Sequence, residues 1–151
     1  MEEILDKKDK LILEILQENS SLTTRQIAKK TLLPPTTIHN RIKKLRDDGI
    51  IRRFTVDIDH EKLKNNFVAY VLISADLKTL KQKNKSQYDL ANELRKFQFV
   101  ERVDIVSGGT DLVTIIRVKG VREFDKILLG TIQLIEGINK TQTMIVIHEG
   151  K

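Results

Sequence analysis

The stretch of residues 23–53 constrains the fold more than any other part of the sequence, because it encodes two short helices with a tight connection between them. Thr23 is followed three residues later by Gln26, an arrangement that predicts a capped helix start. Pro35 suits the first turn of a second helix, and Gly49 suits its left-handed end. Such a pair is typical of a helix-turn-helix, whose second helix enters the major groove of duplex DNA.

The rotation of the second helix follows from its sequence. At about 100° per residue, Ile42 and Leu45 fall on the same side as Ile38, so we expect this side to be buried. Arg41 lies beside the buried side, and we expect it to form a structural ion pair. The opposite side is polar, and Asn pairs with adenine and Lys donates to guanine in the major groove. The residues expected to meet DNA from this helix are Thr36, Thr37, His39, Asn40, Lys43 and Lys44.

Two flanking segments suit phosphates better than bases. Thr24 and Arg25 open the first helix of the pair, where free N–H groups and positive potential attract anions. Residues 50–58 alternate loosely between apolar and polar side chains, which predicts a strand. Arg52 and Arg53 stand at its start, so the strand would act as a wing over the phosphates. For any single polar residue of this surface, simple solvation is the alternative.

The net charge of +6 is unevenly distributed. Residues 20–53 hold nine Lys or Arg against two acidic residues, so the remainder of the chain is slightly acidic. A basic block on a nearly neutral body is the electrostatic footprint of polyanion binding. The alternative is a solvated surface that binds nothing, and the coincidence of the block with the helix pattern favours DNA.

The whole chain is predicted to be an α+β protein with two domains. Residues 1–58 would form a winged helix-turn-helix domain with its first helix at 6–18, residues 59–65 a polar joint, and residues 66–151 a ferredoxin-like βαββαβ domain. The expected elements of that last domain are strands at 67–75, 100–107, 112–118 and 138–148, and helices at 86–97 and 121–135. The residues expected to face inward from the first of these helices are Tyr88, Leu90, Ala91 and Leu94.

The predicted strands are apolar on both faces. An antiparallel sheet with one wet face alternates apolar and polar residues, and two helices can cover only one face. The second apolar face is therefore expected to meet another copy of the chain, since large exposed apolar patches are a liability. This predicts a homodimer joined sheet to sheet. The alternatives are a covered sheet edge or a mere excess of β-branched residues.

The sequence argues against several other classes of protein. His39, His60 and His148 show no metal-ligand spacing, cysteine is absent, and no phosphate-cradling loop or nucleophile elbow occurs, so neither an enzyme nor a required cofactor or metal is expected. The βαββαβ order also occurs in RNA-recognition modules, but the strand at 112–118 lacks the aromatic residues that stack on bases. No export leader or membrane-spanning run is seen, which predicts a cytoplasmic location.

Four segments together resemble the Lrp/AsnC family, the leucine-responsive or feast/famine transcriptional regulators. They are residues 5–13 (LDKKDKLIL), 41–51 (RIKKLRDDGII), 107–112 (SGGTDL) and 136–143 (EGINKTQT). The resemblance implies an N-terminal DNA-binding domain and a C-terminal domain that dimerises, assembles into octamers or similar discs, and often binds an amino acid.

The resemblance also assigns the turn at residues 107–112 to an effector site between dimers. The residues concerned are Gly108, Gly109, Thr110 and Asp111. The glycines would leave backbone N–H groups open to a carboxylate, and Asp111 would meet an ammonium group. The alternative is a plain hairpin turn, for which this composition is ordinary.

One position departs from the family pattern. A Ser or similar cap is usual where Pro34 stands, and Pro34 has no side-chain acceptor. The second helix of the pair would then start at Pro35 or one residue later at Thr36, which changes the register of its contacts with DNA.

The function expected from the sequence is sequence-specific regulation of transcription, tuned by a small molecule such as an amino acid. The alternative is an oligomeric architectural protein that wraps DNA with little base readout. A preference for one sequence that resists salt favours the first function, and uniform binding that collapses with salt favours the second.

Overall fold

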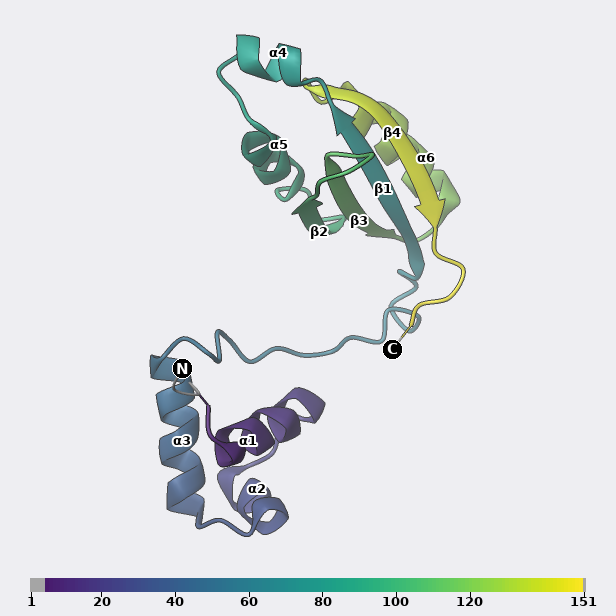
Figure 1. Cartoon of the computed structure of the whole chain (residues 1–151). Helices are drawn as coiled ribbons and strands as arrows, with labels where there is room; N and C mark the ends of the chain where they lie inside the picture. Colours follow the sequence, from purple (N-terminus) through teal and green to yellow (C-terminus); the bar gives the residue numbers. More distant parts are fainter. Residues whose placement is uncertain (1–4, 151) are drawn as a thin grey trace. The chain divides into compact units, whose positions relative to one another are not determined.

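The computed structural model describes residues 5–150, which divide into two compact units, residues 5–58 and 59–150 (Figure 1). Each unit has a separate hydrophobic core. Within the described residues every helix is too short or too polar to span a bilayer.

The N-terminal unit contains three helices, α1 (Lys7–Glu18), α2 (Thr24–Thr31) and α3 (Pro35–Asp47). Helices α1 and α2 each begin with a capping box, formed by Asp6 with Asp9 and by Thr23 with Gln26. These reciprocal bonds satisfy backbone N–H groups that a helix start otherwise leaves open. One apolar stripe from each helix forms the core. Its buried residues are Ile12, Ile15, Leu16, Ile27, Ala28, Ile38 and Leu45.

An ion-pair cluster joins α3 to the start of α1. Arg41 Nη1 donates to Asp6 Oδ2 and to Asp9 Oδ1, at 2.7 Å in each case. Asp9 and then Asp6 raise the pKa of Arg41. The backbone N–H of Asp9 and then the Arg41 guanidinium lower the pKa of Asp6. The expectation that Arg41 is structural is confirmed, and the cluster fixes the rotation of α3 about its axis.

The strand predicted at residues 50–58 is not formed. The segment is irregular, and its apolar side chains Phe54, Val56 and Ile58 are exposed. A strand needs a neighbour for its backbone hydrogen bonds, and the N-terminal unit consists of helices in the residues that the structure describes. The prediction was wrong because the alternation of apolar and polar residues indicates only which faces a strand would have. It does not indicate whether a neighbouring strand is present to pair with it.

The C-terminal unit is the predicted ferredoxin-like βαββαβ fold. Its four strands form one antiparallel sheet in the order β2-β3-β1-β4. The strands are β1 (Phe67–Ala75), β2 (Val100–Ile105), β3 (Leu112–Val118) and β4 (Ile138–Ile145), and the helices are α4 (Leu77–Gln82), α5 (Gln87–Leu94), α6 (Val121–Gly130) and the short 3-10 turn η1 (Ile132–Leu134).

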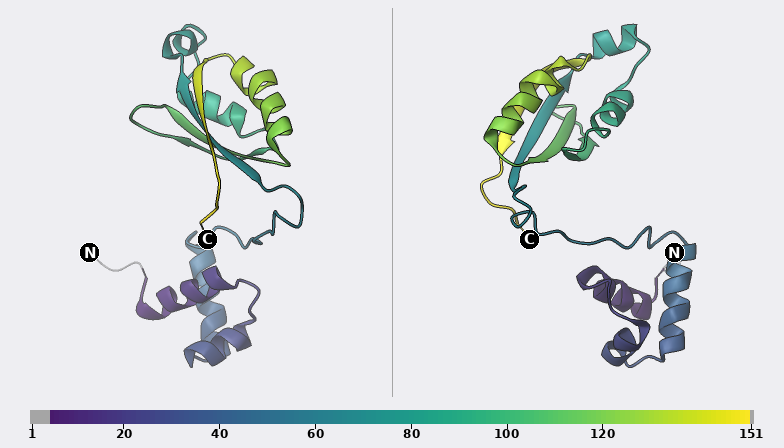
Figure 2. Two further views of the ribbon diagram at one scale, coloured as in Figure 1. Left: turned by 90° about the vertical axis from the view of Figure 1, so that its right-hand side faces the viewer. Right: turned by 180° about the vertical axis from the view of Figure 1, so that it is seen from behind.

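Helices α5 and α6 cover one face of the sheet (Figure 2). Leu90 and Leu94 of α5 and Phe124 of α6 pack with the inward side chains of β1, β2 and β3. Tyr88 was expected to face inward and is instead 72% exposed, because it lies in the first turn of α5 on the side away from the sheet core. Helix α4 was not anticipated, since a single six-residue helix is too short to show a periodicity.

Gly137 lets β4 pass close to α4. It has a φ of +97°, and a Cβ placed there would collide with the side chain of Leu80. Its carbonyl also accepts a hydrogen bond from Asp76 N at 2.8 Å. The close approach therefore needs a residue without a side chain.

The substitution Gly137→Ala is expected to lower the free energy of unfolding by about 1–3 kcal/mol, because it adds left-handed backbone strain to an overpacked contact. Thermal and urea unfolding measure the effect. Gly109→Ala is the matched control, since Gly109 has open space around it and no left-handed φ. Equal stability of the two variants would contradict the prediction.

The substitution Arg41→Ala is expected to lower the melting temperature of the N-terminal unit at neutral pH. The folded state lowers the pKa of Asp6, so the stabilisation is present above the ordinary carboxyl pKa of about 3.9 and is lost as the pH falls through the lowered value. The difference between wild type and variant should therefore narrow in acid. Lys44→Ala is the control, and a difference that stays constant down to about pH 2 would disprove the role of Asp6.

Candidate nucleic-acid interface and effector turn

Helix α3 begins at Pro35, the earlier of the two expected starts. Pro34 is its N-cap and provides no side-chain hydrogen bond, although its carbonyl accepts from Ile38 N at 3.1 Å. No side chain therefore caps the first turn of α3 in the described chain. Open N–H groups at a helix start attract anions such as DNA phosphates.

Burial divides α3 into two faces as the sequence predicts. Ile38 and Leu45 are fully packed against α1 and α2, and Ile42 is half-buried beside them. Five of the six predicted contact residues on α3 are exposed, and Thr37 is half-buried. The exposed five are Thr36, His39, Asn40, Lys43 and Lys44.

The outward face of α3 carries a shallow depression that includes a residue not predicted from the sequence. His39 and Lys43 line it together with Ile42, Arg46 and Asp47. Arg46 is exposed and follows Lys43 by three residues, so both lie on adjacent turns of one side. That spacing was the signal available in the sequence.

The basic side chains of this region differ from Arg41 in having no carboxylate partner. Within residues 5–150, the eight other basic side chains of residues 20–53 form no hydrogen bond or ion pair: Arg25, Lys29, Lys30, Lys43, Lys44, Arg46, Arg52 and Arg53. Unpaired exposed cations remain available to phosphate oxygens and to base edges.

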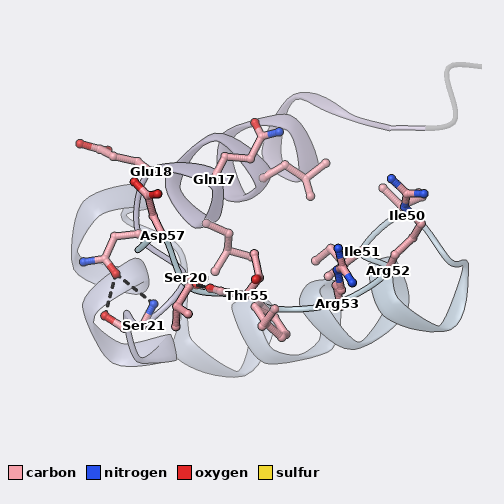
Figure 3. A pocket seen from close by; sticks show the side chains of 15 residues that line it. Gln17, Glu18, Ser20, Ser21, Ile50, Ile51, Arg52, Arg53, Thr55 and Asp57 are labelled. Atoms are coloured by element: carbon pink, nitrogen blue, oxygen red, sulfur yellow. Dashed lines mark hydrogen bonds between the residues drawn. The ribbon is translucent and has the colours of Figure 1, made fainter. Parts of the chain in front are cut away.

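Arg52 and Arg53 line a second hollow, between the end of α1 and residues 50–57 (Figure 3). Ser20 Oγ donates to Thr55 O at 3.4 Å across this hollow. Glu18 and Asp57 also line it, so its charge is mixed. The structure therefore does not place these arginines in the α3 depression.

Thr24 and Arg25 occupy the first turn of α2. Arg25 is exposed and Thr24 is half-buried. The preceding Thr23 accepts from Gln26 N at 3.3 Å, so one N–H group of this turn is already satisfied. Arg25 is the better placed of the two for a phosphate.

Hydrogen bonds fix the predicted effector turn to the end of β1. Thr110 Oγ1 donates to Ile73 O at 2.9 Å, and Asp111 N donates to the same carbonyl at 3.0 Å. The Asp111 carboxylate accepts from Ala75 N at 2.8 Å and from Gln87 Nε2 at 2.7 Å. Thr110 and Asp111 thus have structural roles in the free chain, which the sequence did not reveal.

Gly108 and Gly109 differ from their two neighbours in the turn. Both are exposed, with no atom near the position of a Cβ. Their N–H groups make no hydrogen bond within residues 5–150. Also within that range, no group of three or more His, Cys, Asp or Glu side chains is arranged to hold a metal ion.

Family models match both units. Residues 5–52 match a winged helix-turn-helix DNA-binding model, and residues 69–151 match the Lrp/AsnC ligand-binding domain. The HTH-type transcriptional regulator FL11 of Pyrococcus furiosus is 38% identical over 151 residues, which cover 100% of this chain and 95% of that protein.

Solved structures show the same fold. A transcriptional regulator of Neisseria meningitidis in complex with L-Met has a TM-score of 0.88 and 27% identity, covering 97% of this chain and 92% of that one. Escherichia coli AsnC has a TM-score of 0.82 and 23% identity over 97% and 95% of the two chains, which supports the fold alone. With both units matched, the chain belongs to the Lrp/AsnC family of helix-turn-helix transcriptional regulators.

Proposed function

We propose that this chain regulates transcription by binding a specific sequence of double-stranded DNA in the cytoplasm. Its family consists of transcriptional regulators, so the chain is not an enzyme. The observation that supports specificity is the outward face of α3, where Asn40 and Lys43 are exposed beside a depression while Ile38 and Leu45 hold the other face in the core. Exposed amide and ammonium groups on a fixed helix suit base edges in the major groove.

The proposed DNA contacts fall into two groups. Thr36, Thr37, His39, Asn40, Lys43 and Lys44 face bases and the adjoining backbone from α3. Thr24, Arg25, Arg52 and Arg53 contact phosphates from its flanks. The second group positions the protein and carries no sequence information.

An amino acid is the proposed effector, bound with its carboxylate on the open N–H groups of Gly108 and Gly109. The matched domain is a ligand-binding one, and the Neisseria meningitidis relative was solved with L-Met. Thr110 and Asp111 hold the turn in place, and an ammonium group would compete for the Asp111 oxygens that now accept from Ala75 and Gln87. Ligand binding at this turn would therefore reach the end of β1 and the start of α5.

A homodimer through the uncovered face of the sheet is the proposed assembly, with octamers as a further step. On this face Tyr70 lies directly between Ile115 and Met144, and Leu72 lies beside Val113. Tyr70 is 37% and Met144 47% exposed.

The charged side chains next to this apolar patch are paired with one another. Arg117 is only 8% exposed, and both Glu101 and Glu149 neutralise it. Arg102 and Asp104 pair with each other at 2.7 Å on β2. A second copy related by two-fold symmetry would meet the same arrangement.

The substitution Lys43→Ala is expected to weaken binding to the selected operator by about 1–3 kcal/mol if Lys43 contacts a base. The operator comes from selection out of random duplex DNA, with and without a mixture of the twenty amino acids. A pseudo-palindromic product supports specific readout by a two-fold dimer. Lys126→Ala, an exposed lysine on α6, is the control.

An unbiased selected pool, with binding that collapses as salt rises, would support the architectural wrapping function instead. Unchanged affinity of Lys43→Ala for every DNA tested would exclude this lysine from the interface. Identical selection with and without amino acids would reject the proposed effectors.

The substitution Ile115→Asp is expected to convert the dimer to monomers, because it brings a charge into the apolar patch beside Tyr70. Sedimentation velocity measures the change in mass. Val121→Asp is the matched control, since Val121 is an exposed apolar residue on α6, away from the patch. A wild-type chain that sediments as a monomer would overturn the proposed assembly.

A further inference from the structure

The charge of the C-terminal unit is concentrated in one segment. Residues 77–88, which contain α4 and its connection to α5, hold four lysines and no acidic residue. The other residues from 59 to 151 hold eleven basic and twelve acidic residues, so they are close to neutral. The four side chains, all exposed, form what we call the lysine platform: Lys78, Lys81, Lys83 and Lys85.

The backbone beneath the platform is held firmly. Asp76 caps α4 by accepting from Thr79 N at 3.0 Å and from Thr79 Oγ1 at 2.6 Å. Leu80 is 2% exposed and packs against Gly137. Lys85 N donates to Leu80 O at 2.9 Å, which closes the chain back onto α4. The lysines therefore extend from an anchored element, and not from a loose loop.

Two of the platform lysines form ion pairs within the protein, and both pairs lie at the surface. Lys83 lies 3.2 Å from Glu136, and Lys85 lies 3.9 Å from Glu93, in both cases at the surface. Exposed ion pairs of this kind contribute little stability and exchange readily with other partners. Lys78 and Lys81 have no hydrogen-bond or ion-pair partner among the described residues.

We propose that the lysine platform is a second DNA-binding surface, which holds the phosphate backbone of duplex outside the site that α3 reads. This inference rests on the proposed DNA-binding function. Lysine ammonium groups act as point charges on flexible stems, so they can bind phosphate oxygens without a fixed geometry. In an oligomer the platform is repeated on every subunit, and the contacts act together on one DNA molecule.

The first test is the salt dependence of DNA binding by the full chain. A variant with all four platform lysines changed to Gln is compared with a variant that loses the same charge elsewhere in the C-terminal unit. The control changes are Lys96→Gln, Lys119→Gln, Arg122→Gln and Lys126→Gln, all at exposed positions. The slope of log affinity against log salt should become shallower by about 0.9 for each phosphate that the platform variant no longer neutralises. Equal slopes for the two variants would overturn the proposal.

The second test uses the absence of cysteine from the chain. Lys81→Cys allows an iron chelate to be attached at the platform, and the chelate cleaves nearby DNA backbone. We expect cleavage outside the operator from position 81, and none from the control Lys126→Cys. Absence of cleavage from position 81 on bound DNA would disprove the contact.

The two proposals can fail separately. Weakened binding in Lys43→Ala with unchanged binding in the platform variant rejects only the lysine platform. Weakened binding in the platform variant with unchanged binding in Lys43→Ala supports the platform and rejects the α3 contact at Lys43.

Discussion

The fixed rotation of α3 is the constraint on which the rest of the N-terminal unit depends. Ile38 and Leu45 hold one face in the core, and Arg41 is held by two carboxylates at the start of α1. The polar face must then point outward as one surface. A helix held only by its apolar stripe has more freedom to roll, and side chains that read bases need placement to within a fraction of an ångström.

The basic side chains differ in whether a carboxylate holds them in an ion pair. Arg41 and Arg117 are held by carboxylates and serve the fold, whereas Lys43 and Arg46 have no such partner among the described residues. The turn at residues 107–112 shows the same division. Thr110 and Asp111 form hydrogen bonds within the fold, and the N–H groups of the two glycines beside them bond to nothing in the part of the chain that the structure describes.

Most of the fold could be predicted because its signals are local. Capping residues marked the starts of α1 and α2, and the alternation in β1 and β3 identified the two faces of the sheet. The predictions that were wrong or incomplete concern features that depend on contacts with another segment of the chain. The segment at residues 50–58 lacks a strand to pair with, and Tyr88 is apolar in type but lies on the outer side of α5. Helix α4 depends on the close approach of Leu80 to Gly137.

The sequence alone determined the βαββαβ order of the C-terminal unit, the apolar and polar faces of α3, and the family, because periodicity and short motifs are properties of neighbouring residues. Only the tertiary structure decided that Asp111 bonds to Ala75 and Gln87, that Arg46 shares a depression with Lys43, and that four lysines stand on an anchored platform. Those contacts join residues that are distant in the chain or set the exposure of each side chain. Packing determines both, and local patterns such as the three-residue spacing of Lys43 and Arg46 indicate only part of them.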